Sequence, residues 1–184
     1  SGTAVVMNAE ILGMLVLAQI LKPGMGVIYS CFTLPMDMRL GTLASDSIEL
    51  AMLIVVSAQL SKFYGIGSMI WGPNTDSKAY DGQCGYEKAM QWLLVAQAGI
   101  NLIWGAGMIE NHTIWSDKQL IVDAEICERV GRYLDGIDTG SGSSNFKTIK
   151  EVGHFPGNYL MQPQTLQDLP KEHYIPTISS RHDY

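Results

Sequence analysis

An internal repeat of about 40 residues constrains the fold of this chain more than any other feature of its sequence. Three helix-like segments end in a glutamine, and a short apolar run next to glycine follows each; the glutamines are Gln19, Gln59 and Gln97, and the runs are residues 27–29, 66–71 and 101–104. Such runs are too short for helices and are typical of buried strands. Longer segments of helical periodicity come after them, at residues 47–62, 86–97 and 117–134. This order predicts neighbouring parallel strands joined by crossover helices.

Two parallel architectures fit this order, an open doubly wound sheet and a (β/α) barrel. The units have nearly equal lengths, and no Gly-x-Gly-x-x-Gly phosphate turn follows any of the three runs, which favours the barrel. A closed barrel takes eight units in about 250 residues, and this chain of 184 residues holds about three units and the helix of a fourth. We therefore expect an α/β fold that is the C-terminal portion of a (β/α)8 TIM-type barrel, with a preceding helix. Because the sequence opens on Ser1 without an initiator methionine, we expect its start to be a cut.

Glycine and proline divide the chain into two predicted regions. Residues 1–135 carry the repeat and form the partial barrel. From residue 136 the composition changes to glycine and serine, which is typical of a linker. Residues 145–184 have one short helical pattern, at 165–169, and too few apolar residues for a core of their own. We predict a linker and an extended C-terminal arm over residues 136–184, anchored by large side chains: Phe146, Phe155, Tyr159, Leu160 and Tyr174.

The composition excludes several classes of function. Only 16% of the residues are charged, against about 25% in an average soluble domain, so we expect another subunit to cover much of the surface, as in a homo-oligomer. The net charge of −6 leaves no basic surface for nucleic acid. Cys31, Cys84 and Cys127 lie far apart without a ligand spacing, which argues against disulfides and zinc and favours the cytoplasm.

One apolar run raises the question of a membrane. Residues 11–21 are apolar except for Gly13 and Gln19. The run is shorter than the roughly 20 residues that cross a bilayer, and no basic leader precedes it. We therefore expect no contact with a membrane.

Short motifs along nearly the whole chain point to a known family. They are Asn8-Ala9-Glu10-Ile11-Leu12, Gly26-Val27-Ile28-Tyr29, Asn74-Thr75-Asp76-Ser77-Lys78, Asp81-Gly82-Gln83, Gly85-Tyr86-Glu87-Lys88-Ala89, Asp123-Ala124-Glu125-Ile126, Gly153-His154-Phe155 and Tyr174-Ile175-Pro176. Together they resemble the trimethylamine methyltransferase family, with the greatest specificity at residues 75–88. The chain resembles the branch without pyrrolysine, such as the glycine betaine methyltransferases. Members of the family are longer and form a complete barrel, so the resemblance also implies a C-terminal portion.

The resemblance implies a chemistry as well as a fold. In this family a methyl group passes from a tertiary or quaternary amine, of the trimethylamine or glycine betaine type, to the cobalt of a corrinoid (cobalamin) carried by a separate corrinoid protein. The cobalt is the nucleophile, so the enzyme must hold the ammonium in line and exclude water. The alternative is a non-catalytic fragment that associates with a missing half or with copies of itself, and we expect the isolated chain to be inactive.

Barrel chemistry takes place at the carboxyl ends of the strands, where the three runs place Tyr29, Trp71 and Trp104. Aromatic rings bind quaternary ammonium groups by cation–π attraction. We therefore predict that these three residues bind the substrate. The alternative is that the rings fill layers of the barrel or pack against helices.

The loop after the second run supplies further candidates. Gly72 stands near the place where the resemblance puts pyrrolysine in some relatives; it leaves open the volume of that residue or serves a tight turn. Asn74 and Asp76 are predicted to hold the polar end of the substrate, and Lys78 the edge of the corrinoid. The alternatives are a helix cap at Asp76 or Asp81 and a solvated surface charge at Lys78.

The loop after the first run holds one more candidate. Arg39 carries a planar guanidinium, which suits recognition of a carboxylate such as that of a betaine. An ion pair between Arg39 and Asp37 is the structural alternative.

Overall fold

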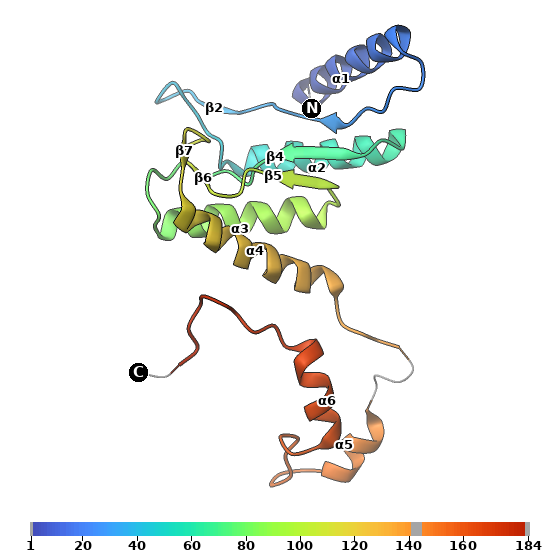
Figure 1. The fold of residues 1–184 in the computed structure, drawn as a ribbon, viewed down its shortest axis with the longest axis vertical. Coiled ribbons are helices and arrows are strands. Elements are labelled where there is room, and N and C mark those ends of the chain that lie inside the picture. The colour runs from blue at the N-terminus through green and yellow to red at the C-terminus, as the bar shows by residue number, and fades with distance from the viewer. Residues whose placement is uncertain (1, 141–144, 183–184) are drawn as a thin grey trace. The chain divides into compact units, whose positions relative to one another are not determined.

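The structure is a computed structural model that describes residues 2–140 and 145–182. The chain has two compact units, Ser1–Val130 and Gly131–Tyr184. Its helices and strands follow one another as α1 (Gly2–Leu21), β1 (Tyr29–Ser30), β2 (Met36–Asp37), β3 (Thr42–Leu43), α2 (Ile48–Tyr64), β4 (Ser68–Trp71), α3 (Gly82–Gln97), β5 (Leu102–Trp104), β6 (Met108–Ile109), β7 (Ile114–Trp115), α4 (Asp117–Asp135), α5 (Phe146–Val152) and α6 (Pro163–Glu172) (Figure 1).

A parallel sheet forms the centre of the first unit. Within the described residues it has three strands in the order β1-β4-β5, with Tyr29 opposite Ser68 and Trp71 opposite Trp104. The predicted neighbouring parallel strands are therefore confirmed. The expected α/β class is confirmed, because helices connect these parallel strands. Within the described residues the sheet ends at β1 and β5 and does not close into a barrel.

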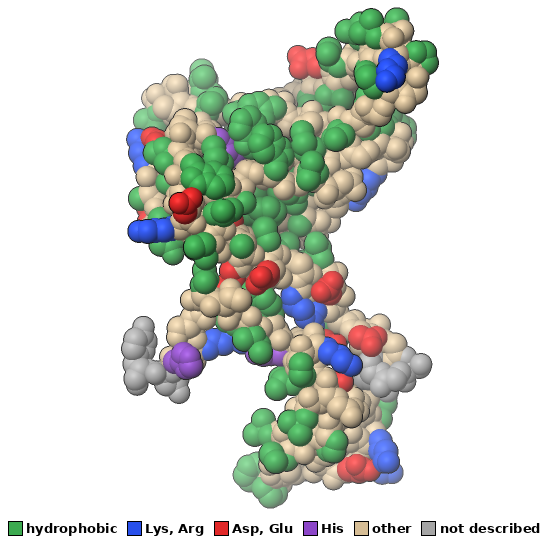
Figure 2. Space-filling model, viewed as in Figure 1, with side chains coloured by type: hydrophobic (Ala, Val, Ile, Leu, Met, Phe, Trp, Pro, Cys, Tyr) green, Lys and Arg blue, Asp and Glu red, His purple; other side chains and the backbone are tan. Residues whose placement is uncertain are grey.

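Helices α2 and α3 pack on one face of this sheet. Alternate residues of β4 are buried, and they point toward these helices and form a common core with them. The core comes from α2, β4, α3 and the turn before β5: Leu50, Ile54, Ala58, Ile70, Val95 and Ile100. On the opposite face, Leu102 and Trp104 are about half exposed. Figure 2 shows many more hydrophobic side chains at the surface of the first unit.

Local signals explain where α2 and α3 begin. Ser47 Oγ accepts a hydrogen bond from the amide of Leu50 at 3.3 Å, and Gly65 ends α2 in the left-handed conformation that glycine favours. Asp81 Oδ1 accepts from the amide of Cys84 at 2.9 Å, and this bond is the main reason why the pKa of Asp81 is lowered. Asp81 is thus an N-cap, as the structural alternative predicted.

Helix α1 is longer than the apolar run from which we expected a segment too short to cross a bilayer, and this expectation is corrected. The apolar run at residues 11–21 belongs to a helix of 20 residues, because the apolar residues 4–6 extend it in front of Asn8 and Glu10. Within the described residues, α1 is the one helix long and apolar enough to cross a membrane, judged by length and composition. The core helix of a soluble protein passes the same test, so this finding alone does not assign α1 to a bilayer. Met7 is the only buried residue of α1, and a groove of about 410 Å³ lies between α1 and β1.

The second unit contains two short helices, and none of its described residues is buried. Helix α6 includes the predicted helix at residues 165–169, whereas α5 lies where an extended arm was expected. Three of the five predicted anchors are largely exposed in this chain, Phe146 by 75%, Phe155 by 96% and Leu160 by 75%, whereas Tyr174 is half-buried. Arg132 pairs with Glu172 at 2.8 Å within this unit.

Candidate functional site

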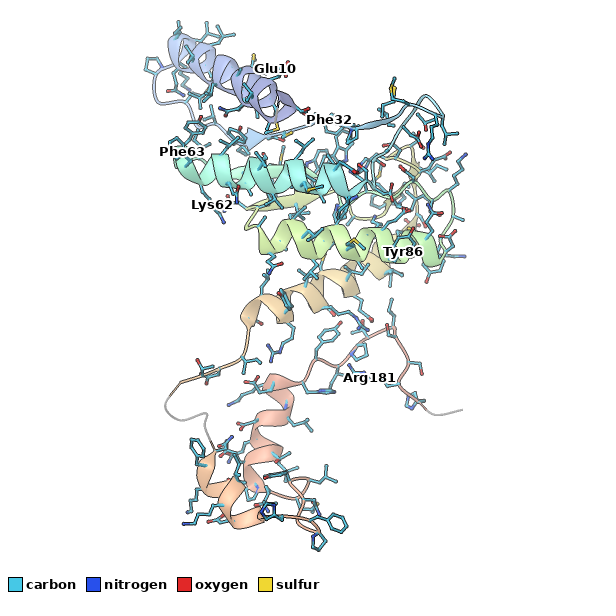
Figure 3. All side chains as sticks on the ribbon, turned by 180° about the vertical axis from the view of Figure 1, so that it is seen from behind. Glu10, Phe32, Lys62, Phe63, Tyr86 and Arg181 are labelled. Carbon is cyan, nitrogen blue, oxygen red and sulfur yellow. The ribbon has the colours of Figure 1, made fainter. Side chains whose placement is uncertain are left out.

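Two tryptophans stack at the carboxyl end of the sheet. Trp71 ends β4 and Trp104 ends β5, and register partners in parallel strands point to the same face. Their ring centroids are 4.8 Å apart, with 12° between the ring planes. Phe32, labelled in Figure 3, lies beyond β1 at 5.1 Å from Trp71, and His112 lies at 5.0 Å. We call these four rings the aromatic cluster; two of its members, Phe32 and His112, were not predicted from the sequence.

The rings of the aromatic cluster differ in exposure. Trp71 is partly buried because three rings surround it. Trp104 and Phe32 keep 46% and 58% of their surface exposed. A cation that approaches from solvent therefore meets the rings of Trp104 and Phe32 first.

Two glycines permit the close approach of these rings. Gly72 and Gly105 have φ values of 145° and 115°, in a region that other residues rarely adopt. A Cβ on Gly105 would lie 3.2 Å from Trp71 Cδ1 and 3.4 Å from His112 Cε1. A Cβ on Gly72 would lie 3.4 Å from the side-chain amide of Asn74. Both interpretations of Gly72, the tight turn and the open volume, agree with this geometry.

Several buried polar atoms around the aromatic cluster have no hydrogen-bond partner. They are Trp71 Nε1, Asn74 Oδ1 and both ring nitrogens of His112. Burial, with a smaller effect of the Lys88 charge, lowers the pKa of His112 to about 4. The imidazole is therefore neutral at pH 7 and adds no positive charge to the cluster.

The loop after β4 is held by buried side chains of α3. Thr75 Oγ1 donates to Glu87 Oε2 at 2.6 Å, and the amide of Asp76 donates to the same oxygen at 3.1 Å. The amide of Asn74 donates to Gln91 Oε1 at 3.0 Å. Because backbone amides are the donors, α3 fixes the path of the chain directly after Trp71. The motif residues Thr75 and Glu87 thus position this loop.

Three carboxyl groups gather behind this loop. Asp76 Oδ1 accepts from Ser45 Oγ at 2.6 Å, and Asp46 hydrogen-bonds with both Asp76 and Glu87. Burial, followed by these two neighbours, raises the pKa of Asp46 to about 7. The predicted substrate ligand Asp76 is therefore engaged in a structural cluster. Within the described ranges, no group of three or more His, Cys, Asp or Glu residues is arranged to hold a metal ion.

A buried ion pair fixes the loop that carries Gly105. Lys88 pairs with Asp123, and both side chains are fully buried. Lys88 Nζ also donates to the carbonyl of Met108 at 2.8 Å, and the amide of Gly107 donates to Asp123 Oδ2 at 2.7 Å. The segment from Gly105 to β6 is thus tied to α3 and α4. Both charged residues belong to the family motifs, which is the signal that marked them.

Tyr29 lies away from the tryptophans. It stands opposite the buried Ser68 on the face that the helices cover, its hydroxyl donates to Asn8 Oδ1 at 2.9 Å, and its ring stacks on Tyr64. The structure therefore does not bring together the three predicted aromatic residues.

The two predicted cationic residues also lie outside the aromatic cluster. Arg39 donates to both carboxylate oxygens of Asp37, at 3.1 and 2.7 Å, in the β2–β3 hairpin. Hydrogen bonds from Arg39 are the main reason why the pKa of Asp37 is lowered to about 2. Lys78 is exposed, with Glu110 as an ion-pair partner at 3.9 Å.

The parallel sheet with helices on one face makes this an α/β fold, a class in which ligands commonly bind beyond the carboxyl ends of the strands. Its sequence matches the trimethylamine methyltransferase (MTTB) family over residues 1–184. The chain belongs to this family, and the resemblance found in the motifs is confirmed.

Two curated relatives with names from this family are similar to the chain. The chain is 38% identical over 184 residues to trimethylamine methyltransferase MttB of Methanosarcina barkeri, an alignment that covers 99% of this chain and 36% of that protein. It is 36% identical over 185 residues to the glycine betaine methyltransferase of Desulfitobacterium hafniense (strain Y51), which covers 100% of this chain and 38% of that protein. The chain thus spans little more than a third of the length of these relatives.

Proposed function

We propose that this chain is the C-terminal portion of the (β/α)8 barrel of a cytoplasmic, corrinoid-dependent amine methyltransferase. Its reaction moves a methyl group from a tertiary or quaternary amine to the corrinoid of a partner corrinoid protein. One observation carries the proposal: the aromatic cluster stands at the carboxyl ends of β4 and β5, with two of its rings open to solvent. Membership of the family, and relatives named for trimethylamine and glycine betaine, support it.

The barrel is supported by the sheet itself. Strands β1, β4 and β5 are parallel and in chain order, with α2 and α3 on one face. An edge strand has unpaired backbone groups that can form hydrogen bonds with a further strand. In the described part of the sheet, β1 and β5 are such edge strands. In a closed barrel, the face that bears Trp71 and Trp104 would be the interior.

The exposed rings of Trp104 and Phe32 are suited to hold a methylated ammonium. Each ring over a cation contributes about 0.5–2 kcal/mol, more where water is excluded. Trp71 supports Trp104 from behind by stacking. The neutral imidazole of His112 does not repel the cation.

The proposed reaction requires no proton transfer by these residues. When bound, the corrinoid supplies a nucleophilic metal that takes the methyl group. The C–N bond of the amine breaks with both electrons staying on nitrogen, so an ammonium leaves as a neutral amine and needs no proton from the protein. The aromatic cluster then has two tasks, which are to orient one methyl outward and to exclude water.

The residues at this edge of the sheet fit a corrinoid. The β2–β3 and β6–β7 hairpins follow β1 and β5 and lie beyond the carboxyl ends of the strands (Figure 1). They expose Met36, Met38 and Trp115, whose apolar surfaces suit a macrocycle. Lys78 adds an exposed cation at its rim.

Binding calorimetry on the full-length protein tests the ammonium site. Trp104→Leu should weaken binding of glycine betaine about two- to thirtyfold, as expected for the loss of one cation–π contact. Binding of 3,3-dimethylbutanoate, in which carbon replaces the ammonium nitrogen, should change little. Phe63→Leu, at an exposed aromatic residue of α2 outside the aromatic cluster, is the control and should affect neither ligand. Equal losses for the two ligands would make Trp104 a packing residue.

Self-association is a second candidate, favoured by the apolar exposure of α1. Of its 20 residues only Met7 is buried. Soluble monomers rarely leave an apolar surface of this size exposed. We propose that a homo-oligomer or the rest of the protein covers it. Sedimentation of the chain as a compact monomer without binding of an apolar dye would exclude this association.

A further inference from the structure

Three carboxyl groups from three different segments meet behind the β4 loop. Asp46 lies in the turn between β3 and α2, Asp76 in the loop after β4, and Glu87 in α3. We call these three residues the carboxyl cluster. Asp46 hydrogen-bonds with both other members. Two ionised carboxylates cannot hydrogen-bond with each other, because neither has a donor, so the cluster holds at least one proton.

The donors around the carboxyl cluster place this proton on Asp46. Asp76 Oδ1 accepts from the amide and the hydroxyl of Ser45, at 3.2 and 2.6 Å. Glu87 Oε2 accepts from the Thr75 hydroxyl at 2.6 Å and from the Asp76 amide at 3.1 Å. Hydrogen bonds of this kind stabilise the charged form of a carboxyl group. Asp46 is therefore the member that keeps the proton and acts as the donor.

The surroundings of Asp46 offer no cation that could replace this proton. From the β4 loop and α3, the titratable groups that face it are Asp76, Glu87 and Tyr86, the last of which is labelled in Figure 3. Within the described residues, no member of the carboxyl cluster takes part in an ion pair. A cavity of about 200 Å³ lies beside the cluster, between the first turns of α2 and α3. Its lining from α2 and the residue before it is uncharged: Ser47, Ile48 and Ala51.

The carboxyl cluster joins the two segments that carry Phe32 and Trp71 of the aromatic cluster. Asp76 follows Trp71 in the β4 loop. On the other side, the amide of Ala44 donates to the carbonyl of Pro35 at 2.9 Å. The turn between β3 and α2 thus holds the base of the β2–β3 hairpin, close after Phe32 in the chain. Because the centroids of the Phe32 and Trp71 rings are 5.1 Å apart, their contact depends on this turn staying against the β4 loop.

We propose that the proton on Asp46 is a latch: it holds the turn between β3 and α2, and with it Phe32, against the β4 loop, and its loss loosens the β2–β3 hairpin. Without the proton three carboxylates would lie side by side, which like charges disfavour. Asp46 is then a positioning residue, through which pH regulates the amine site. This effect on the amine rests on the proposed function, whereas the latch itself is a property of the fold.

The direction of the pH effect follows from the protonated form. Burial and the two neighbouring carboxyl groups raise the pKa of Asp46 to about 7. A group whose pKa is raised in the folded state contributes its stabilisation at low pH and loses it as the pH rises. The latch is therefore closed at pH 6 and loosened at pH 8.

A neutral bridge limits the size of the effect. Gln91 donates to the carbonyl of Ser45 at 3.1 Å and accepts from the amide of Asn74 at 3.0 Å, so it joins the same turn and loop at every pH. One pH unit above the pKa changes the balance of two protonation states about tenfold. Because Asp46 is only partly buried, solvent reduces the effect to about two- to tenfold.

Calorimetry on the full-length protein at pH 6 and pH 8 tests the latch. Glycine betaine keeps the same charge over this range, so a pH dependence of its binding comes from the protein. The wild type should bind it about two- to tenfold more weakly at pH 8 than at pH 6. Asp46→Asn, whose amide donates at both pH values, should bind it equally tightly at both. Asp46→Ala, without a donor, should bind weakly at both, and the matched control Asp135→Asn should follow the wild type.

Hydrogen exchange measures the latch without any amine. Wild type and Asp46→Asn are compared at one pH, so the chemical exchange rates of their amides are the same away from the substitution. At pH 8 the amides of residues 36–44 should exchange about two- to tenfold faster in the wild type, and at pH 6 alike. Residues 146–152, in α5 of the second unit, are the internal reference and should exchange alike at both pH values.

The two measurements separate the possible failures. Equal exchange of residues 36–44 in the two proteins at pH 8 would overturn the latch. Faster exchange in the wild type without any change in its affinity for glycine betaine would overturn the positioning role of Asp46. A fall in affinity toward pH 8 that persists in Asp46→Asn would assign the pH dependence to another group and overturn the proposal. If exchange shows the latch and glycine betaine binds at neither pH, the latch stands and the proposed function fails.

Discussion

The loop after β4 and the second unit of the chain are held in opposite ways. In the loop, Asn74 and Thr75 are buried and bonded to Gln91 and Glu87 of α3, whereas no described residue of the second unit is buried. A buried polar group without its partner costs about 1–3 kcal/mol, while an exposed ion pair contributes about 0–1 kcal/mol. The most specific family motif, residues 75–88, therefore lies where hydrogen bonds are buried, and it specifies the position of a loop as much as any chemistry.

The largest loss of stability is expected for a substitution among the buried polar groups of the first unit. Lys88→Met leaves the carboxylate of Asp123 buried and uncompensated, and breaking one side of a buried ion pair costs about 3–5 kcal/mol. Thermal unfolding should show a large fall in Tm. Since the pair ties down the segment of Gly105, affinity for glycine betaine should fall as well.

Two controls separate the ion pair from a general loss of charge. Lys147→Met, on the exposed pair with Glu151 in the second unit, should leave Tm unchanged. The double variant Lys88→Met with Asp123→Leu should recover only part of the lost stability. It leaves no buried charge, but the Gly107 amide and the Met108 carbonyl still lose their partners. A Tm for Lys88→Met equal to that of Lys147→Met would mean that the buried pair is not formed.

A smaller, pH-dependent effect is expected at Asp46. Its pKa is raised to about 7 in the folded chain, from 3.8 when free, so the folded state binds more protons between these two values. Stability then falls as the pH rises from about 4 to about 7. Asp46→Asn removes this loss, so the variant should be more stable than the wild type at pH 8 and gain less at pH 5. Because Asp46 is only partly buried, solvent reduces the effect to a few degrees in Tm.

The matched control is Asp135→Asn, at an exposed position outside the carboxyl cluster. It should shift the Tm equally at both pH values. An Asp46→Asn variant that tracks the wild type from pH 5 to pH 8 would show that Asp46 does not share a proton with Asp76 and Glu87.

Hydrophobic runs and glycine spacing were sufficient to predict the parallel sheet. Residues 69–71 and 102–104 are apolar at every position, which is typical of a buried parallel strand and is visible in the sequence. The β2–β3 and β6–β7 hairpins were not predicted, because two-residue strands carry no measurable period. Helix α5, with seven residues, was missed for the same reason.

The candidate site was only half predictable. Trp71 and Trp104 follow from their place at strand ends, but Tyr29 points to the other face because its strand pairs with β4 in a register that the sequence does not reveal. His112 joins the cluster through three left-handed residues, a conformation with no sequence signal except a short polar stretch. Lys88 and Asp123 could be recognised only as family motifs, since their pairing depends on the packing of α3 and α4.

The smallest effect on stability is expected in the exposed second unit, at Leu160. The sequence predicted a buried anchor there, yet this side chain is 75% exposed in the chain. Burial of a leucine contributes about 1.5–3 kcal/mol, and an exposed one contributes little of this. In the chain of residues 1–184, Leu160→Ser should therefore leave Tm unchanged. In the full-length protein the predicted arm would lie on a larger body, so the same substitution should lower Tm or loosen the arm, measured by faster proteolysis after residue 136. Equal behaviour in both proteins would mean that Leu160 anchors nothing, and a lower Tm in the short chain would mean that the second unit has a core of its own.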